Sequence, residues 1–164
     1  MSFSYDNIEK SIEVLRLDLS IPELAKLAEE ETFTAEQLAA VDSILGYLQK
    51  KKKQTTINTM LRMSRLPLKS PKTFANFDFS VVRGKDSEKL KALSSLAAIH
   101  AHKNIAFIGP AGIGKTHLAQ AFGYECCQQG LKTYFIKMSE LRDRFTAARR
   151  TGKEASVLNS LVRP

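Results

Sequence analysis

Residues 104–120, "NIAFIGPAGIGKTHLAQ", constrain the fold of this chain more than any other part of the sequence. A short apolar run stops abruptly at Gly109, as a β-strand buried on both faces of a sheet would. A glycine-rich loop then leads into a helical pattern over residues 116–129, with Gly130 placed to end it. The order of apolar run, loop and helix predicts a buried strand followed by a helix.

A second strand and a second helix are predicted directly after this unit. Residues 132–137, "KTYFIK", combine β-branched and aromatic side chains, which favour strands. Ser139 is placed to cap the next helix, which carries Leu141, Phe145 and Ala148 on one face. Strand, glycine loop, helix, strand and helix together predict an α/β fold.

The loop reads Gly109-Pro110-Ala111-Gly112-Ile113-Gly114-Lys115-Thr116, which fits the pattern G-x-x-x-x-G-K-[ST]. Successive backbone N–H groups surround a polyphosphate only where side chains stay out of the way, and glycines allow that wrapping. The helix after the loop directs the positive end of its dipole at the same place. Lys115 is predicted to contact the β- and γ-phosphates, and Thr116 is predicted to ligate Mg²⁺. The predicted nucleotide site comprises this loop and His117.

Two other interpretations of the loop are weaker. A G-x-G-x-x-G dinucleotide fingerprint has no use for the Lys115–Thr116 pair. A glycine-rich turn without a ligand requires a chance match, whose probability in 164 residues is about 1% or less from average residue usage. The loop therefore predicts binding of a nucleoside triphosphate with Mg²⁺.

Residues 1–66 are predicted to form an all-helical N-terminal domain. Capping boxes at the starts of helices are predicted from the spacing of Asp6 with Glu9, Ser20 with Glu23, and Thr34 with Gln37. An apolar stripe then passes through the basic segment "QKKKKQTT". The pattern predicts either one long helix with a solvated basic middle or two helices broken there.

Prolines and phenylalanines mark a domain boundary after this helical region. Pro67 and Pro71 interrupt the helical pattern, so residues 67–85 are predicted to be an extended linker. Residues 86–164 are then the N-terminal part of a P-loop nucleotide domain, which opens with a helix over residues 86–103.

The formal net charge of +8 is divided unevenly along the chain. Residues 1–48 carry ten acidic and three basic side chains, whereas residues 49–164 carry seven acidic and twenty-two basic ones. A basic body of this kind suits contact with the phosphate backbone of DNA, through residues 50–53 and through Arg149 and Arg150. The alternative is a basic surface that serves only solubility.

The composition is that of a globular cytoplasmic protein. Apolar residues make up 43% and charged residues 26% of the chain. No run approaches the ~20 apolar residues that span a bilayer, and the N-terminus lacks the pattern of a secretory signal. Cys126 and Cys127 are neighbours without zinc-site spacing, so they are predicted to be buried or half-buried thiols. No membrane partner is expected.

Three stretches together resemble the IstB-like ATP-binding proteins, relatives of the DnaC helicase loader among the AAA+ ATPases. The most specific are "FDFS" at residues 77–80 and "GIGKTHLA" at residues 112–119, and the helical N-terminus matches in kind. The resemblance implies an ATP-dependent helper of DNA transposition that assembles into homo-oligomers on DNA and works with a transposase. The DnaC branch implies a replicative helicase as the partner instead.

The resemblance also implies which parts the chain lacks. Family members continue into an apolar strand that ends in Asp-Glu, the Walker B acids, and then supply sensor residues and an arginine finger. No Asp-Glu pair occurs in this sequence. We therefore expect a C-terminally truncated ATPase domain with weak or absent hydrolysis. In the AAA+ sheet other strands separate the first two, so the two predicted strands are not expected to pair.

Roles for the linker aromatics and for the whole chain stay open at this stage. Phe77 and Phe79 either border the adenine, as the resemblance implies, or anchor the linker to the core. A non-catalytic DNA- or partner-binding module is the main alternative to the transposition helper. A small P-loop kinase is a third interpretation, but the sequence offers no clear lid or acceptor site after the second strand.

Overall fold

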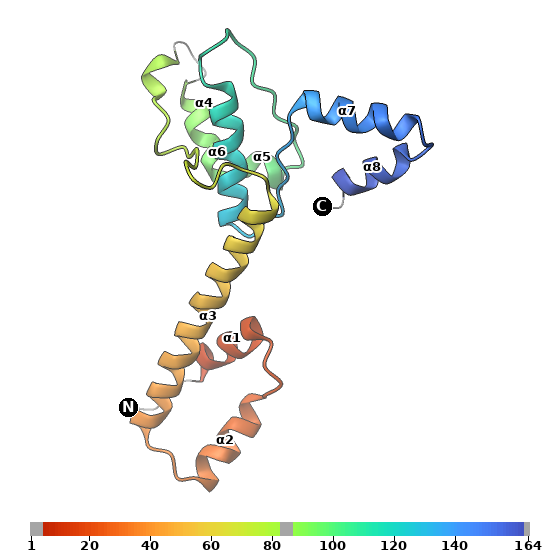
Figure 1. The fold of residues 1–164 in the computed structure, drawn as a ribbon. Coiled ribbons are helices and arrows are strands. Elements are labelled where there is room, and N and C mark those ends of the chain that lie inside the picture. Colours follow the sequence, from red (N-terminus) through yellow and green to blue (C-terminus); the bar gives the residue numbers. More distant parts are fainter. Residues whose placement is uncertain (1–4, 83–86, 163–164) are drawn as a thin grey trace. The chain divides into compact units, whose positions relative to one another are not determined.

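The computed structural model describes residues 5–82 and 87–162. The chain divides into two compact units, Met1–Thr56 and Ile57–Pro164, and the division falls inside one helix (Figure 1). The linker and domain boundaries predicted from the sequence stay predictions. Among the described residues, no helix combines the length and apolar character needed to cross a membrane.

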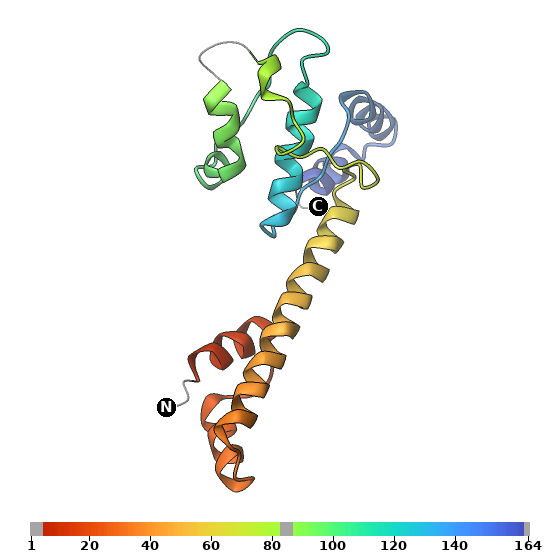
Figure 2. The same ribbon diagram turned by 90° about the vertical axis from the view of Figure 1, so that its left-hand side faces the viewer.

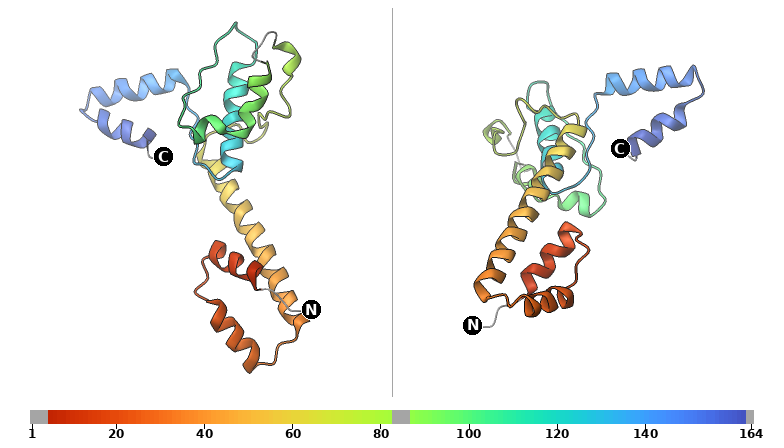
Figure 3. Two further views of the ribbon diagram at one scale, coloured as in Figure 1. Left: turned by 180° about the vertical axis from the view of Figure 1, so that it is seen from behind. Right: turned by 60° about the horizontal axis from the view of Figure 1, so that its bottom comes forward.

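The first unit consists of α1 (Asp6–Leu15), α2 (Ile21–Glu30) and the N-terminal part of α3 (Ala35–Met63). α1 lies beside α3, and α2 diverges from the start of α3 after the loop that joins them (Figure 3). Buried residues Ile8, Ile12 and Leu24 form the centre of the unit, and α3 contributes half-buried Val41 and Leu45 to the same cluster. Burial of this apolar stripe is what holds the three helices together.

Two predicted caps and the continuous helix are confirmed in this unit, whereas the capping box predicted from Asp6 and Glu9 is wrong, because the N-cap of α1 is Tyr5 and it makes no side-chain cap bond. Ser20 accepts from the backbone N–H of Glu23, and the Glu23 carboxylate accepts from the N–H of Ser20 at 2.8 Å. Thr34 and Gln37 make the same reciprocal pair ahead of α3. Between the two sequence-based alternatives for the basic segment, the single long helix is correct, because α3 runs without a break from Ala35 to Met63.

One lysine of the basic run belongs to the first unit's own structure. The Lys52 ammonium donates to the backbone carbonyls of Val14 at 3.1 Å and Leu15 at 2.7 Å, the last carbonyls of α1. A cation at this position pairs with groups that the helix itself leaves without partners. The four lysines at 50–53 are therefore not equivalent.

The second unit carries the remaining helices and the loops between them (Figure 2). These helices are η1 (Phe79–Val81), α4 (Ser87–Ala92), η2 (Leu93–Ser95), α5 (Ala97–His100), α6 (Lys115–Gln128), α7 (Met138–Arg149) and α8 (Glu154–Val162). α6 ends as predicted at Gly130, which has φ +81°. The N–H of Gly130 bonds the carbonyl of Cys127, and the N–H of Leu131 bonds that of Cys126, which together form a Schellman cap.

The helix predicted over residues 86–103 is broken, and that prediction is wrong. Its start at residue 86 lies outside the described residues, and the helix is interrupted at Leu96, which has φ +55°. The hydroxyls of Ser94 and Ser95 donate to carbonyls of the preceding turn, and this competes with continuation of the helix. Leu96 is fully buried, so burial of its side chain compensates for the left-handed backbone.

Neither predicted strand pairs into a sheet among the described residues, so the α/β class is not confirmed there. Residues 104–110 and 131–137, which we call the first and second extended segments from their drawn-out course in Figure 1, have no regular secondary structure, because a strand requires ladder hydrogen bonds with a neighbour. The second segment makes one such contact, from the N–H of Phe135 to the carbonyl of Ser64 at 2.7 Å. Ile108, predicted to be buried on both faces, is 94% exposed.

A charged cluster ties the end of α3 to the second extended segment and to α7. Arg144 donates to the Tyr134 hydroxyl at 2.7 Å and to the Glu140 carboxylate at 2.8 Å, and Arg65 donates to the same two groups. Hydrogen bonding to Arg65 lowers the pKa of Glu140 and of Tyr134. The N-cap of α7 is Lys137 without a side-chain cap, so the prediction that Ser139 caps this helix is wrong.

We predict that the Glu140 cluster makes the second unit less stable in acid. Because the folded-state pKa of Glu140 lies below its ordinary 4.5, its stabilising contribution is present above that pH and is lost as the pH falls through the folded value. The Glu140→Gln variant should therefore lose stability at pH 7 and show a smaller further loss between pH 5 and pH 3 than the native chain. Urea unfolding across this range measures the difference. The Asp143→Asn variant, changed on the same helix at a carboxylate that pairs with exposed Arg142, serves as control, and equal acid sensitivity of all three chains would contradict the prediction.

Candidate phosphate-binding site

The glycine loop connects the first extended segment to α6. Gly112 has φ +80° and Gly114 has φ +92°, a region that residues with a Cβ enter only with strain. Gly114 is also the N-cap of α6, so the left-handed turn sets the angle at which the helix begins. The sequence places glycine at the two loop positions where the backbone requires it.

The backbone N–H groups of the loop are free to bind an anion. From Ala111 to His117, none of them donates to a backbone carbonyl of the described residues, and Leu118 is the first to bond back into the helix, to Gly114 at 2.9 Å. Such a run of unpaired donors at a helix N-terminus is an anion-binding arrangement. The residues present therefore fit the phosphates of a nucleotide.

Lys115 and Thr116 lie at the first turn of α6, where the pattern predicts them. The Lys115 ammonium folds back over the loop and donates to the carbonyl of Pro110. Its charge thus lies across the mouth of the loop, where it can exchange a backbone carbonyl for phosphate oxygens. Thr116 is exposed, and its hydroxyl takes part in no hydrogen bond among the described residues, which fits the predicted role as a ligand of Mg²⁺.

Phe77, which lies in the predicted linker, packs beneath the loop. A Cβ built at Gly114 would lie 2.5 Å from Cε2 of Phe77, so the ring is pressed against the Gly114 backbone. Phe77 is 9% exposed and meets Phe79 edge to face, with centroids 4.9 Å apart. Of the two roles considered for Phe77, bordering the adenine and anchoring the linker to the core, this burial favours the second.

His117 faces the linker and not the mouth of the loop. Its Nε2 lies 3.0 Å from the carbonyl oxygen of Thr73 and 3.0 Å from Oδ1 of Asn76, and its ring lies 5.2 Å from that of Phe77. Thr73 and Asn76 were not predicted from the sequence. Their T-x-x-N spacing resembles a capping box and could have indicated them: the two residues bond each other reciprocally, at 2.8 and 3.2 Å.

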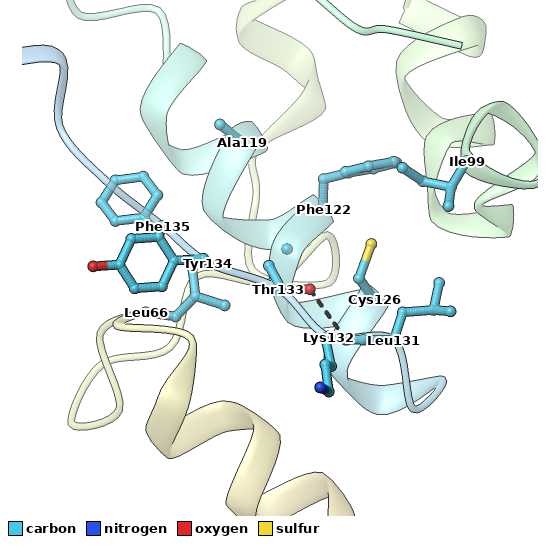
Figure 4. Close-up of a pocket in the computed structure, with 11 residues that line it drawn as sticks. Leu66, Ile99, Ala119, Phe122, Cys126, Leu131, Lys132, Thr133, Tyr134 and Phe135 are labelled. Carbon is cyan, nitrogen blue, oxygen red and sulfur yellow. Dashed lines mark hydrogen bonds between the residues drawn. The ribbon is translucent and has the colours of Figure 1, made fainter. Parts of the chain in front are cut away.

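Two cavities adjoin α6, and they differ in chemistry. The first, of about 500 Å³, contains Gly109, Pro110, Ile113 and Lys115 from the loop together with apolar residues of α4 and of the extended segment. The second, of about 420 Å³, lies on another side of α6 between Phe122, Cys126 and residues 131–135 (Figure 4). Among the described residues that line it, Lys132 alone is charged. The first cavity therefore suits a phosphorylated ligand better.

The two cysteines are buried in α6, as the sequence predicts. Burial raises the pKa of the Cys126 thiol to about 11, so this side chain stays protonated at neutral pH. A protonated thiol is a poor nucleophile and a poor metal ligand. Cys126 acts as a small apolar residue of the helix core.

The loop geometry agrees with a comparison against known protein families. The model of the IstB-like ATP-binding proteins matches residues 10–164, which is nearly the whole chain. The chain is an IstB-like ATP-binding protein. The resemblance inferred from the loop and the linker is thereby confirmed. Membership supports a P-loop NTPase fold, although the described residues form no sheet.

Several curated relatives, whose names describe ATP-binding proteins of insertion sequences, match the chain over part of their length. A Geobacillus stearothermophilus relative, named for ATP binding in insertion sequence IS5376, is 38% identical over 69% of this chain and 44% of its own length. An IS232 relative from Bacillus thuringiensis is 27% identical over 91% of this chain and 59% of its own. An IS21 relative from Pseudomonas aeruginosa is 34% identical over 54% of this chain and 32% of its own. The chain thus spans roughly one third to three fifths of these relatives.

We predict that Gly114→Ala lowers the free energy of unfolding more than Gly112→Ala does. Both changes force a Cβ into the left-handed region at a cost of about 1–2 kcal/mol, but only Gly114→Ala also meets Phe77, whereas the space around Gly112 is open. The steric overlap adds about 1–3 kcal/mol of destabilisation. Urea unfolding of the two variants measures the difference. The double variant Gly114→Ala/Phe77→Leu should recover part of the loss, and equal stability of the two single variants would contradict the packing described above.

Proposed function

We propose that this chain binds ATP with Mg²⁺ and serves as an IstB-like helper of DNA transposition, together with a transposase. The observation that carries the proposal is the loop, which combines unpaired N–H donors from Ala111 to His117 with the Lys115 ammonium. Family membership supports ATP as the nucleotide. The relatives support the setting, because their names place them in insertion sequences.

Different residues of the loop would contact different parts of a bound nucleotide. The N–H groups would hold the phosphate oxygens, and Lys115 would leave Pro110 to neutralise the β- and γ-phosphates. Thr116 would hold Mg²⁺, which supplies charge neutralisation to the phosphates when it is bound. We therefore propose that these residues bind a nucleoside triphosphate with Mg²⁺.

DNA, a homo-oligomer and a cytoplasmic location are parts of the same proposal. The second half of the chain is strongly basic, and residues 50, 51 and 53 of the lysine run are exposed on α3. Arg149 and Arg150 are exposed at the end of α7. A helicase loader would use the same loop and the same basic surfaces with a replicative helicase as partner. A non-catalytic DNA-binding module would use the basic surfaces alone.

The first test is ATP binding by a Lys115→Ala variant. Loss of a charge-assisted contact to phosphate should weaken binding of a fluorescent ATP analogue about 10- to 100-fold. Fluorescence anisotropy with Mg²⁺ present measures the dissociation constant. Lys103→Ala removes the same charge at an exposed position before the loop and should leave affinity unchanged. Native chain that binds no ATP, or equal affinity of both variants, would overturn the proposal.

The second test concerns DNA binding by the lysine run. Lysines 50, 51 and 53 are changed to glutamine together, and Lys52 is kept because it caps α1. Loss of three phosphate contacts should reduce the slope of log K against log salt by about 2–3. A control changes three exposed lysines elsewhere, Lys69, Lys103 and Lys153, with the same change of net charge. An unchanged salt slope in the triple lysine variant would remove the lysine run from the proposed DNA surface. DNA binding that is unaffected by ATP and by Lys115→Ala would favour the non-catalytic module.

A further inference from the structure

A short stretch of the linker is fastened to the first turn of α6 at two points. At one point the ring of Phe77 presses on the backbone of Gly114. At the other, Nε2 of His117 lies 3.0 Å from both the Thr73 carbonyl oxygen and Oδ1 of Asn76. The two points lie on either side of Lys115 and Thr116. We call Thr73, Asn76, Phe77 and His117 the linker clamp.

The partners of His117 determine which of its nitrogens carries a proton. The amide nitrogen of Asn76 donates to the Pro71 carbonyl at 2.9 Å, and its Oδ1 accepts from the N–H of Thr73 at 2.8 Å, so the amide orientation is set by its own bonds. Both groups that face Nε2 are therefore oxygen acceptors. Nε2 must carry a hydrogen and share it between them. The clamp thus depends on one donor at one position of the imidazole.

The clamp bears directly on the conformation of the phosphate loop. Because the N–H groups of the loop make no backbone hydrogen bonds, such bonds do not stabilise its conformation. That conformation therefore depends on contacts with neighbouring residues. His117 is the residue after Thr116 and belongs to the same helical turn as Lys115. Its imidazole bonds the linker, while its backbone N–H belongs to the run of free donors.

We propose that His117 is a positioning residue for nucleotide binding: through Nε2–H it clamps residues 73–77 to the first turn of α6 and so holds the loop donors and Lys115 in place for a nucleoside triphosphate. This inference rests on the proposed function. By thermodynamic linkage, a clamp that favours nucleotide binding is itself strengthened by the nucleotide. ATP should therefore protect the linker stretch, although no residue of this stretch needs to touch the ligand.

The test compares His117→Gln with His117→Leu. A glutamine amide nitrogen can donate to two oxygens from a similar position, whereas leucine fills the space without a donor. His117→Leu should weaken binding of a fluorescent ATP analogue about tenfold, the effect of one lost shared hydrogen bond. His117→Gln should stay within about threefold of the native chain. The thermal unfolding of each variant is measured alongside, to show that both are folded.

A second readout follows the linker itself. Trypsin cleavage after Lys72, which precedes the clamp, should be slowed by ATP in the native chain and in His117→Gln but not in His117→Leu. If leucine prevents folding, Asn76→Ala takes its place, since it removes one acceptor from the exposed side of the same contact. In His117→Gln/Asn76→Ala the donor should no longer restore affinity, because the two changes act on one contact.

The possible outcomes separate this inference from the proposed function. If the native chain binds no ATP, the proposed function fails and the clamp loses its role with it. If the native chain binds ATP and His117→Leu binds it equally well, only the clamp is overturned. Equal weakening by leucine and glutamine, without loss of ATP protection after Lys72, would also overturn the clamp, because the donor would then be irrelevant.

Discussion

Unpaired backbone donors must be held in place by something other than the donors themselves. From Ala111 to His117 the N–H groups have no backbone acceptor within residues 5–82 and 87–162, and an unpaired polar group is tolerated only where water or a ligand reaches it. Residues 109–112 and Thr116 are accordingly exposed, and Ile113, Gly114 and Lys115 are half-buried over the contacts that shape the loop. Leu118 is buried one residue after the run of donors, and Phe77 closes the space below Gly114.

The C-terminal end of α6, like its N-terminal end, is held by specific contacts. Gly130 closes the helix in a Schellman cap, and the chain turns back so that Thr133 reaches the helix, with Cγ2 3.1 Å from a Cβ built at Gly123. A side chain at Gly123 would force this contact apart. α6 thus meets the linker at one end and the second extended segment along its length.

The sequence predicted those features that depend on neighbours within a few residues. The cap at Ser20 needs only Glu23, three positions away, and the end of α6 needs only a glycine at residue 130. The phosphate loop is local in the same sense, since all its predicted contacts lie within residues 109–117. Such features follow from backbone geometry and need no knowledge of packing.

Features that depend on distant partners were the ones that sequence reasoning missed. The break at Leu96 depends on burial of that side chain, which helical periodicity does not report. The imidazole of His117 bonds residues more than forty positions earlier, so nothing around "GKTHLA" reveals its partner. The predicted strands required neighbours that the local pattern cannot supply, and residues 104–110 form no ladder among the described residues.

The lysine run illustrates how one segment can serve two requirements. Its cations give α3 a basic stretch, yet Lys52 is used inside the first unit, at the last carbonyls of α1. Charge counting treats the four side chains as equal, whereas hydrogen bonding distinguishes them. A run of like charges is therefore only an upper bound on the surface available to a phosphate backbone.

The exposed residues 104–110 affect the tendency of the protein to aggregate. Ile108 is 94% exposed, and in the part of the chain that the structure describes the peptide groups on either side are not paired in a ladder. An apolar segment with free peptide groups is a template for strand pairing with any chain that offers a matching edge. The formal charge of +8 opposes close approach of identical copies at low ionic strength. Added salt screens that repulsion but leaves the unpaired segment unchanged. Aggregation is therefore expected to increase with both ionic strength and protein concentration.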